Sequence, residues 1–165
     1  MSLACGINPL IAAHISKSVE LHDVGKAKIP SYILNKPGKL SQKEFELMKY
    51  HTLLGAEMLS GLSGDFGVIA RNICAFHHEQ YGGKGYCGVY ADNLPLYVQI
   101  ASICDVAVAL LHKRVYKSAW PPIAVFKYIK SESGKQFNPM LVEIFLSLMC
   151  EQDVKDILKP EPVLN

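Results

Sequence analysis

One long apolar segment constrains the fold of this chain more than any other feature. Residues 94–112 read LPLYVQIASICDVAVALLH, with Asp105 as the single acidic residue among them. A helix that is apolar on every side is typical of a protein core. No apolar run approaches the roughly 20 residues that a membrane span needs. We therefore expect a buried helix around Asp105, whose carboxylate requires a partner or a metal ion.

The remaining apolar residues recur mostly at helical spacing, which predicts more helices and no strand. Asn8 with Pro9, Ser41 with Glu44, and Asn138 with Pro139 are typical of helix starts. The expected helices cover residues 9–22, 41–59, 66–79, 94–112, 121–131 and 139–150, whereas residues 25–40 and 82–88 are expected to be loops. Six or seven helices would make an all-α domain.

Composition narrows the class of protein. Half of the 165 residues are apolar and 19% are charged, which suits a single domain, residues 1–165, with a substantial core. The net charge of +2 gives no bulk attraction to a DNA or RNA polymer or to a membrane. The five cysteines form no CxxC pair, so reduced thiols in the cytoplasm are expected rather than a cysteine zinc site. The start, MSLACGINPL, does not resemble a signal peptide.

A set of histidines and acids lies on, or at the ends of, different predicted helices. Helices in a bundle can direct such groups to one point, where imidazole and carboxylate bind transition metals. Neighbouring residues on a helix point about 100° apart, so two adjacent pairs favour two ions about 3.5–4 Å apart. By itself a histidine such as His51 is more often a hydrogen-bonded core residue, and His14 and His112 are interpreted that way or as solvated. The candidates are His22, Asp23, His51, His77, His78 and Asp105.

These residues occur within a series of longer motifs. LHDVGKAKIPSYILNKPGKL, HHEQYGGKGY, the Asp105 segment and RVYK follow in order. Over residues 20–146 the series resembles the HD-GYP domain, a branch of the HD superfamily of metal-dependent phosphohydrolases. The resemblance implies an HD-domain-like helical bundle from which the first family helix is missing. It also implies hydrolysis of cyclic di-GMP to pGpG or GMP, with a metal-activated hydroxide attacking in line.

The resemblance also implies roles for individual residues. The six candidates named above would be metal ligands for two divalent ions, with Fe or Mn favoured and Zn or Ni accepted. Lys26 would lie beside the scissile phosphate and act with Asp23 in catalysis, while Tyr86, Arg114 and Lys117 would contact the nucleotide. This agrees with elementary chemistry, because two cations and a lysine neutralise phosphodiester charge and a guanidinium grips phosphate with two donors.

Several positions depart from the family pattern. GYP reads GYC at Cys87, Asp-Gly is replaced by Gly82–Gly83, and a second aspartate on the Asp105 helix is replaced by Val108. The alternative hypothesis is therefore a degenerate, non-catalytic module of a longer signalling protein that acts through nucleotide or protein contacts. The missing helix would uncover an apolar face, which favours a protein partner or a homodimer.

Overall fold

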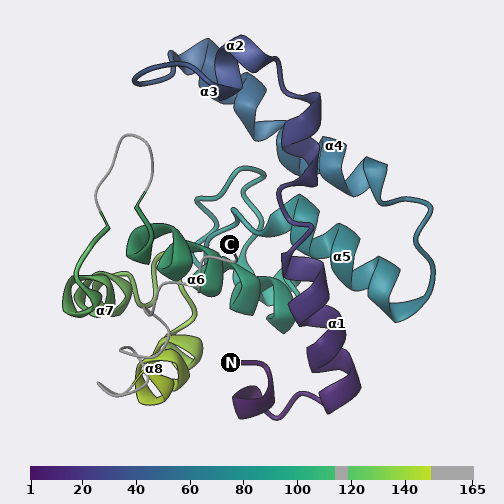
Figure 1. Ribbon diagram of the computed structural model, residues 1–165. Coiled ribbons are helices and arrows are strands. Elements are labelled where there is room, and N and C mark those ends of the chain that lie inside the picture. Colours follow the sequence, from purple (N-terminus) through teal and green to yellow (C-terminus); the bar gives the residue numbers. More distant parts are fainter. Residues whose placement is uncertain (114–118, 150–165) are drawn as a thin grey trace, which may run out of the picture.

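Figure 1 shows the computed structural model, which describes residues 1–113 and 119–149. Within these ranges the chain forms α-helices and short 3₁₀ helices, and it forms no strand. The prediction of an all-α fold is confirmed. None of the helices in the described ranges has both the length and the apolar character that crossing a membrane requires. The elements are η1 Leu3–Cys5, α1 Pro9–Val19, η2 Val24–Lys28, α2 Ser31–Leu34, α3 Gln42–Lys49, α4 His51–Met58, α5 Gly64–Phe76, η3 Ala91–Asn93, α6 Leu96–Leu111, α7 Pro122–Ser131 and α8 Pro139–Leu148.

Helix α6, the apolar segment of the sequence, lies at the centre of the fold (Figure 1). One side of it packs with α1 and α5 in a cluster that includes Ile15, Ile73 and Val98. Farther along α6, Ile103 and Ala107 pack against α7 and α8. Because apolar neighbours cover it on both sides, α6 holds Asp105 inside the molecule at a fixed place.

The predicted helix starts are confirmed. The side chain of Asn8 accepts a hydrogen bond from the backbone N–H of Leu10, at 2.9 Å, and Pro9 opens α1. Ser41 and Glu44 form the expected capping box at α3. Asn138 caps α8 through the N–H of Met140, at 3.0 Å. Caps of this kind each stabilise a helix by about 1 kcal/mol.

Several predicted boundaries were wrong. Helix α1 ends at Val19, so the expected helical residues 20–22 form a turn, and the expected loop 25–40 contains η2 and α2. The expected helix 41–59 divides at Tyr50 into α3 and α4. At this break the His51 ring donates to the carbonyl of Met48 and the Thr52 hydroxyl donates to that of Lys49. These side chains donate hydrogen bonds to carbonyl oxygens that would accept backbone N–H groups in a continuous helix, so they compete with the helical hydrogen bonds at this point.

The division at Tyr50 also separates an arm from the bundle. Helices α2 and α3 lie apart from α5–α8 and join them through α4 (Figure 1). Helix α3 has no buried residue, and Tyr32 and Tyr50 are 67% and 56% exposed. Helix α2 buries Ile33, but Ile33 lies outside the apolar clusters of the bundle. The arm, which consists of α2 and α3, therefore borders the site described below without joining those clusters.

A close crossing of η2 and α4 connects the arm to the histidine cluster. Gly25 is buried in η2, directly beneath α4. A Cβ added there would overlap the carbonyl oxygen of His51 and lie 2.5 Å from the backbone N of Gly55. These are backbone atoms, which cannot turn aside as a flexible side chain can. The absence of a side chain at Gly25 therefore sets the distance between the His22–Asp23 turn and His51.

Gly25→Ala is expected to lower the free energy of unfolding by about 3 kcal/mol, because the added methyl forces η2 and α4 apart. Urea denaturation of the metal-free protein measures the change. Gly61→Ala is the matched control, since a Cβ at Gly61 has no atom within 4 Å. Equal stability of the two variants would show that the crossing is not tight.

Candidate metal centre

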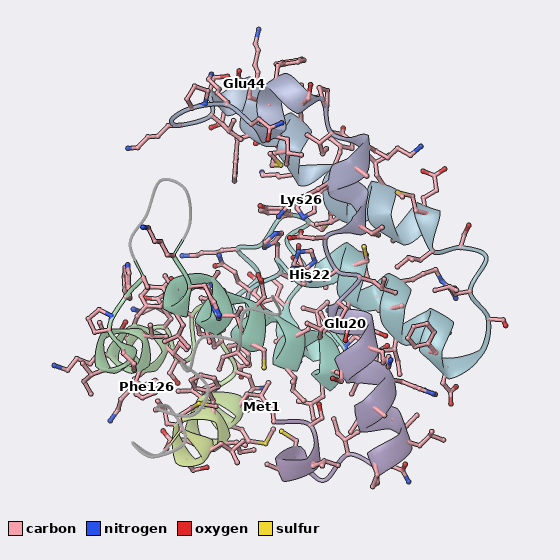
Figure 2. All side chains as sticks on the ribbon, viewed as in Figure 1. Met1, Glu20, His22, Lys26, Glu44 and Phe126 are labelled. Atoms are coloured by element: carbon pink, nitrogen blue, oxygen red, sulfur yellow. The ribbon has the colours of Figure 1, made fainter. Side chains whose placement is uncertain are left out.

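The predicted ligands come from separate parts of the chain. His22 and Asp23 lie in the turn between α1 and η2, and His51 is the first residue of α4. His77 caps the C-terminus of α5 and His78 follows it, while Asp105 lies midway along α6. The structure brings all of these residues together. Figure 2 shows His22 and Lys26 where these segments meet.

Asp23 lies between the histidines and presents an oxygen to each side. Its Oδ1 is 3.3 Å from Nε2 of His51 and 3.8 Å from Nε2 of His77. Its Oδ2 is 3.3 Å from Nε2 of His22 and 2.5 Å from Nζ of Lys26. This arrangement is that of a carboxylate able to bridge two ions. Asp105 closes the cluster, with Oδ1 3.5 Å from Nε2 of His22.

Backbone carbonyls fix the orientation of the histidine rings. Nδ1 of His22 lies 2.6 Å from the carbonyl of Val19, and Nδ1 of His51 lies 2.7 Å from that of Met48. Nδ1 of His77 is 3.1 Å from each of two carbonyls of α5. A carbonyl only accepts, so each Nδ1 carries the proton and donates it. In the neutral ring this leaves the Nε2 lone pair for a metal ion, as in most histidine metal sites.

Three buried atoms in this cluster lack a hydrogen-bond partner within the described residues. They are Oδ1 of Asp23, Nε2 of His51 and Nε2 of His77. When the two rings are neutral, each of the three atoms carries a lone pair and no proton, and the three face one another. Burying such atoms without a hydrogen bond or a cation is costly. A cation among them would satisfy all three together. The residues therefore fit a transition-metal ion.

The electrostatics agree with this donor set. Burial, helped by His22, lowers the pKa of His77 to about 4, and burial with His77 lowers the pKa of His78 to about 3. Both rings are therefore neutral near pH 7 and ready to bind a metal. Burial raises the pKa of Asp23, but its contacts with His22 and with the ammonium of Lys26 outweigh burial and hold the pKa well below its ordinary value. Burial likewise raises the pKa of Asp105, and the bond with His22 outweighs it and lowers the pKa.

His22 differs from the other histidines. Burial lowers its pKa, but the hydrogen bonds with Asp105 and Asp23 outweigh burial and raise the pKa to about 10. Without metal, His22 is therefore protonated and pairs with both carboxylates. A metal ion at Nε2 would displace this proton. The positive charge of the ion would then replace that of the protonated ring beside the two carboxylates.

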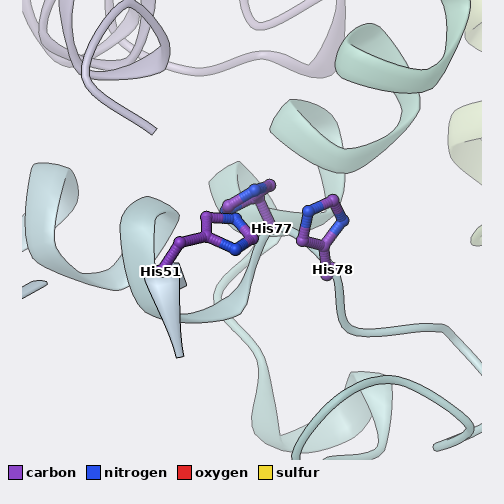
Figure 3. A group of neighbouring side chains, drawn as sticks. All are labelled: His51, His77 and His78. Atoms are coloured by element: carbon purple, nitrogen blue, oxygen red, sulfur yellow. The ribbon is translucent and has the colours of Figure 1, made fainter. Parts of the chain in front are cut away.

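The ligand atoms form two overlapping groups. His51, His77 and His78 form one group, and His22, Asp23 and His77 form the other. The ligand atoms within each group lie within 4.8 Å of one another. Figure 3 shows the first group, in which the His77 and His78 rings are 4.0 Å apart between centroids. Because His77 belongs to both groups, the two positions for an ion are adjacent.

The structure describes two of the four residues predicted to contact the substrate. Lys26 lies on η2, and its ammonium forms an ion pair with Asp23. Tyr86 lies in residues 82–88, here called the glycine loop, with its ring centroid 4.6 Å from that of His78. Both therefore border the metal centre. Arg114 and Lys117 fall outside the described residues.

Sequence reasoning missed the role of Glu79. Its carboxylate is 4% exposed and accepts the backbone N–H groups of Cys87, at 2.6 Å, and Val89, at 2.8 Å. A Cβ at Gly85 would lie 2.7 Å from Oε2 of Glu79. The carboxylate thus holds the loop that carries Tyr86, and Gly85 allows the loop to come this close. The signal in the sequence was the acid directly after the histidine pair.

Comparisons with known proteins agree with this geometry. A family model described as HD domain matches residues 2–141. The chain is 40% identical over 133 residues to a cyclic di-GMP phosphodiesterase response regulator of Xanthomonas campestris, covering 80% of this chain and 35% of that protein. It is 36% identical over 157 residues to a cyclic di-GMP phosphodiesterase of Thermotoga maritima, covering 94% of this chain and 42% of the other. It is 38% identical over 133 residues to 3′3′-cGAMP-specific phosphodiesterase 2 of Vibrio cholerae, covering 80% of this chain and 26% of that protein. The chain thus spans less than half the length of each of these relatives.

Asp23→Asn is expected to remove at least one bound metal ion per chain, because the amide is a much weaker ligand than the bridging carboxylate. Elemental analysis of protein loaded with Mn²⁺ under reducing conditions measures the loss. Asp65→Asn, at an exposed position in the first turn of α5, is the control. Full loading of the Asp23 variant would show that the metal binds elsewhere.

Glu79→Gln is expected to loosen the glycine loop. The amide keeps one acceptor but turns its NH₂ toward the second backbone donor, at a cost of about 1–3 kcal/mol. Tryptic cleavage after Lys84 reports opening of the loop and should become at least several-fold faster. Glu143→Gln, at an exposed position on α8, should leave the cleavage rate unchanged.

Proposed function

This chain belongs to the HD domain family, and from that premise we propose that it is a metal-dependent phosphodiesterase acting on cyclic dinucleotides. HD domain phosphohydrolases depend on metals, and the chain carries a His/Asp cluster that fits them. One observation carries the proposal: the buried lone pairs of Asp23, His51 and His77 face one another without a proton donor between them.

The relatives support the choice of substrate class. The names of two of those cited above say that they act on cyclic di-GMP, and the name of the third specifies 3′3′-cGAMP. Both compounds are cyclic dinucleotides with two phosphodiester linkages. We assign the same class to this chain, with cyclic di-GMP as its first candidate, and place the activity in bacterial signalling.

The proposed metal set is two divalent ions. The two adjacent ligand groups support a pair of ions, which Asp23 and His77 would help to hold, and Fe or Mn suits a site of imidazoles and carboxylates. When bound, such ions would neutralise phosphodiester charge and lower the pKa of a coordinated water. In this proposal all six predicted ligands, His78 and Asp105 included, hold the ions.

Lys26 would act on the substrate. Its ammonium is held by Asp23 and its side chain remains 38% exposed, so one side of the charge is open to a ligand. Negative charge increases on the phosphoryl oxygens during attack, and an ammonium held in advance stabilises it without reorganisation. Tyr86, whose ring lies 4.6 Å from that of His78 between centroids, would contact the nucleotide, as would Arg114 and Lys117.

The alternative of a degenerate module rested on several departures from the family pattern, of which Cys87 in the glycine loop is one. The backbone N–H of Cys87 donates to Glu79 at 2.6 Å, and the proline of the family pattern could not make this bond. The substitution therefore exchanges the rigidity of proline for a hydrogen bond to a buried carboxylate. This observation favours the enzyme over the module.

We also propose a cytoplasmic location and a single domain. Cys5, Cys74, Cys87 and Cys104 are free thiols, which suits a reducing compartment. Helix α6 contacts α1, α5, α7 and α8, so the described helices share one central element.

The test is incubation of the Mn²⁺-loaded chain with cyclic di-GMP under reducing conditions, read by nucleotide chromatography. Wild type should form pGpG or GMP. Lys26→Met should lower the rate about 10²–10³-fold, the cost of removing one group that stabilises transition-state charge. Lys28→Met, at an exposed position on the same 3₁₀ helix, is the control. A metal-loaded wild type that cleaves no cyclic dinucleotide would favour the module.

A further inference from the structure

A cavity next to the metal centre is lined mostly by residues that the mechanism above does not use. Glu46, Lys49, Tyr50 and Leu53 follow the spacing i, i+3, i+4, i+7 and therefore lie on one face of α3 and α4. They form one wall of a cavity of about 210 Å³, and the glycine loop forms the other wall with Tyr86 and Cys87. The bundle core and the arm meet here.

The cavity and the metal centre share a wall. The Tyr86 ring lies 4.6 Å from the His78 ring and 6.3 Å from the His51 ring, between centroids. Tyr86 also lines the cavity. A nucleotide with its phosphate among the histidines would therefore place an attached base beside Tyr86 and toward the cavity.

The cavity presents a carboxylate and an ammonium side by side. Nζ of Lys49 donates to Oε1 of Glu46 at 3.0 Å, and it lies 5.5 Å from the centroid of the Tyr86 ring. Gln42 also donates to Oε1 of Glu46, at 2.8 Å. Among the described residues no hydrogen bond reaches Oε2, which leaves an anionic acceptor next to a cationic donor. An exposed pair of this kind adds little to stability.

This arrangement distinguishes the purines. Guanine presents the N1–H and N2–H₂ donors beside the O6 acceptor, so a carboxylate can accept both donors while an ammonium donates to O6. Adenine presents an acceptor at N1 and a donor at N6, which places like groups opposite both charges. Exposed faces of Tyr50 and Leu53, at 56% and 49% exposure, add apolar surface against which a flat base can pack.

We propose that this cavity binds one guanine base of the cyclic dinucleotide, with Glu46 reading N1–H and N2–H₂ and Lys49 reading O6. The assignment rests on the proposed phosphodiesterase function and extends it to the choice of base. It makes Glu46 and Lys49 specificity-determining residues, distinct from the ligands and from Lys26. The second base of the substrate lies outside this cavity.

The test compares the rates of the Mn²⁺-loaded full chain on four substrates: cyclic di-GMP, 3′3′-cGAMP, cyclic di-AMP and bis(4-nitrophenyl) phosphate, which has no base. Wild type should cleave both guanine-containing compounds with kcat/KM about tenfold above cyclic di-AMP, since a bidentate base contact is worth about 1–3 kcal/mol of discrimination and tenfold corresponds to about 1.4 kcal/mol. Equal kcat/KM for all three dinucleotides would overturn the assignment.

Two variants test the residues. Glu46→Gln loses one of the two acceptors, so its kcat/KM should fall about tenfold on cyclic di-GMP, mainly through KM, and stay unchanged on bis(4-nitrophenyl) phosphate. Lys49→Met should behave likewise. Glu57→Gln on α4 and Lys43→Met on α3, both outside the cavity, are the matched controls.

The outcomes separate the two proposals. No cleavage of any substrate by metal-loaded wild type overturns the phosphodiesterase, and the base assignment with it. Cleavage of cyclic di-GMP that Glu46→Gln and Lys49→Met leave unchanged overturns the base assignment alone. A loss on bis(4-nitrophenyl) phosphate equal to that on cyclic di-GMP also overturns it, because the variants would then have damaged the metal centre.

Discussion

The rest of the site depends on one half-buried carboxylate. Asp23 stands where the His22 turn, α4 and α5 meet, and its two oxygens face imidazoles from all three. Lone pairs directed at one buried point repel one another unless a cation lies between them. The fold imposes this arrangement through close packing of the backbone, chiefly Gly25 beneath the backbone of His51. Packing energy from the α6 core thus holds together a set of ligands that would separate on their own.

Sequence reasoning found the elements that depend on local chemistry. Caps such as Asn8 and Ser41 act within one helical turn, so their effect can be read from neighbouring residues. The family motifs predicted the six candidate ligands that the fold brings together, because metal chemistry restricts which residue types can serve. The break at Tyr50 escaped prediction because it arises from the side chains of His51 and Thr52 competing for carbonyls, within an otherwise unbroken helical pattern. The cavity beside Tyr86 escaped it because the two walls are about 35 residues apart in sequence and meet only in the fold.

The glycine loop shows how a departure from a family pattern can be compensated. A proline at the position of Cys87 would restrict the backbone without donating to Glu79. Cysteine leaves the backbone freer but adds a donor to a carboxylate that also binds the N–H of Val89. A buried charge with two backbone donors is among the stronger local restraints in a protein. The position of Tyr86 therefore depends on Glu79 and Gly85 here, and the loss of the family's proline is no evidence of lost function.

In the two proposals above, the shared wall at Tyr86 connects catalysis to base recognition. Its ring packs on His78, a proposed metal ligand, and also lies near the His51 ring and near Phe45 and Lys49 on the arm. The arm makes few contacts with the core, so its position relative to the histidines depends on Tyr86 and on the crossing at Gly25. Binding energy from a base held between Glu46 and Lys49 would be transmitted through the same ring to the phosphate beside the histidines. In such an arrangement the base is held by contacts that differ between guanine and adenine, whereas the metal centre responds to phosphate alone. Selectivity among cyclic dinucleotides can then change by substitution on the exposed face of α3, while the ligand set and the core that supports it remain the same.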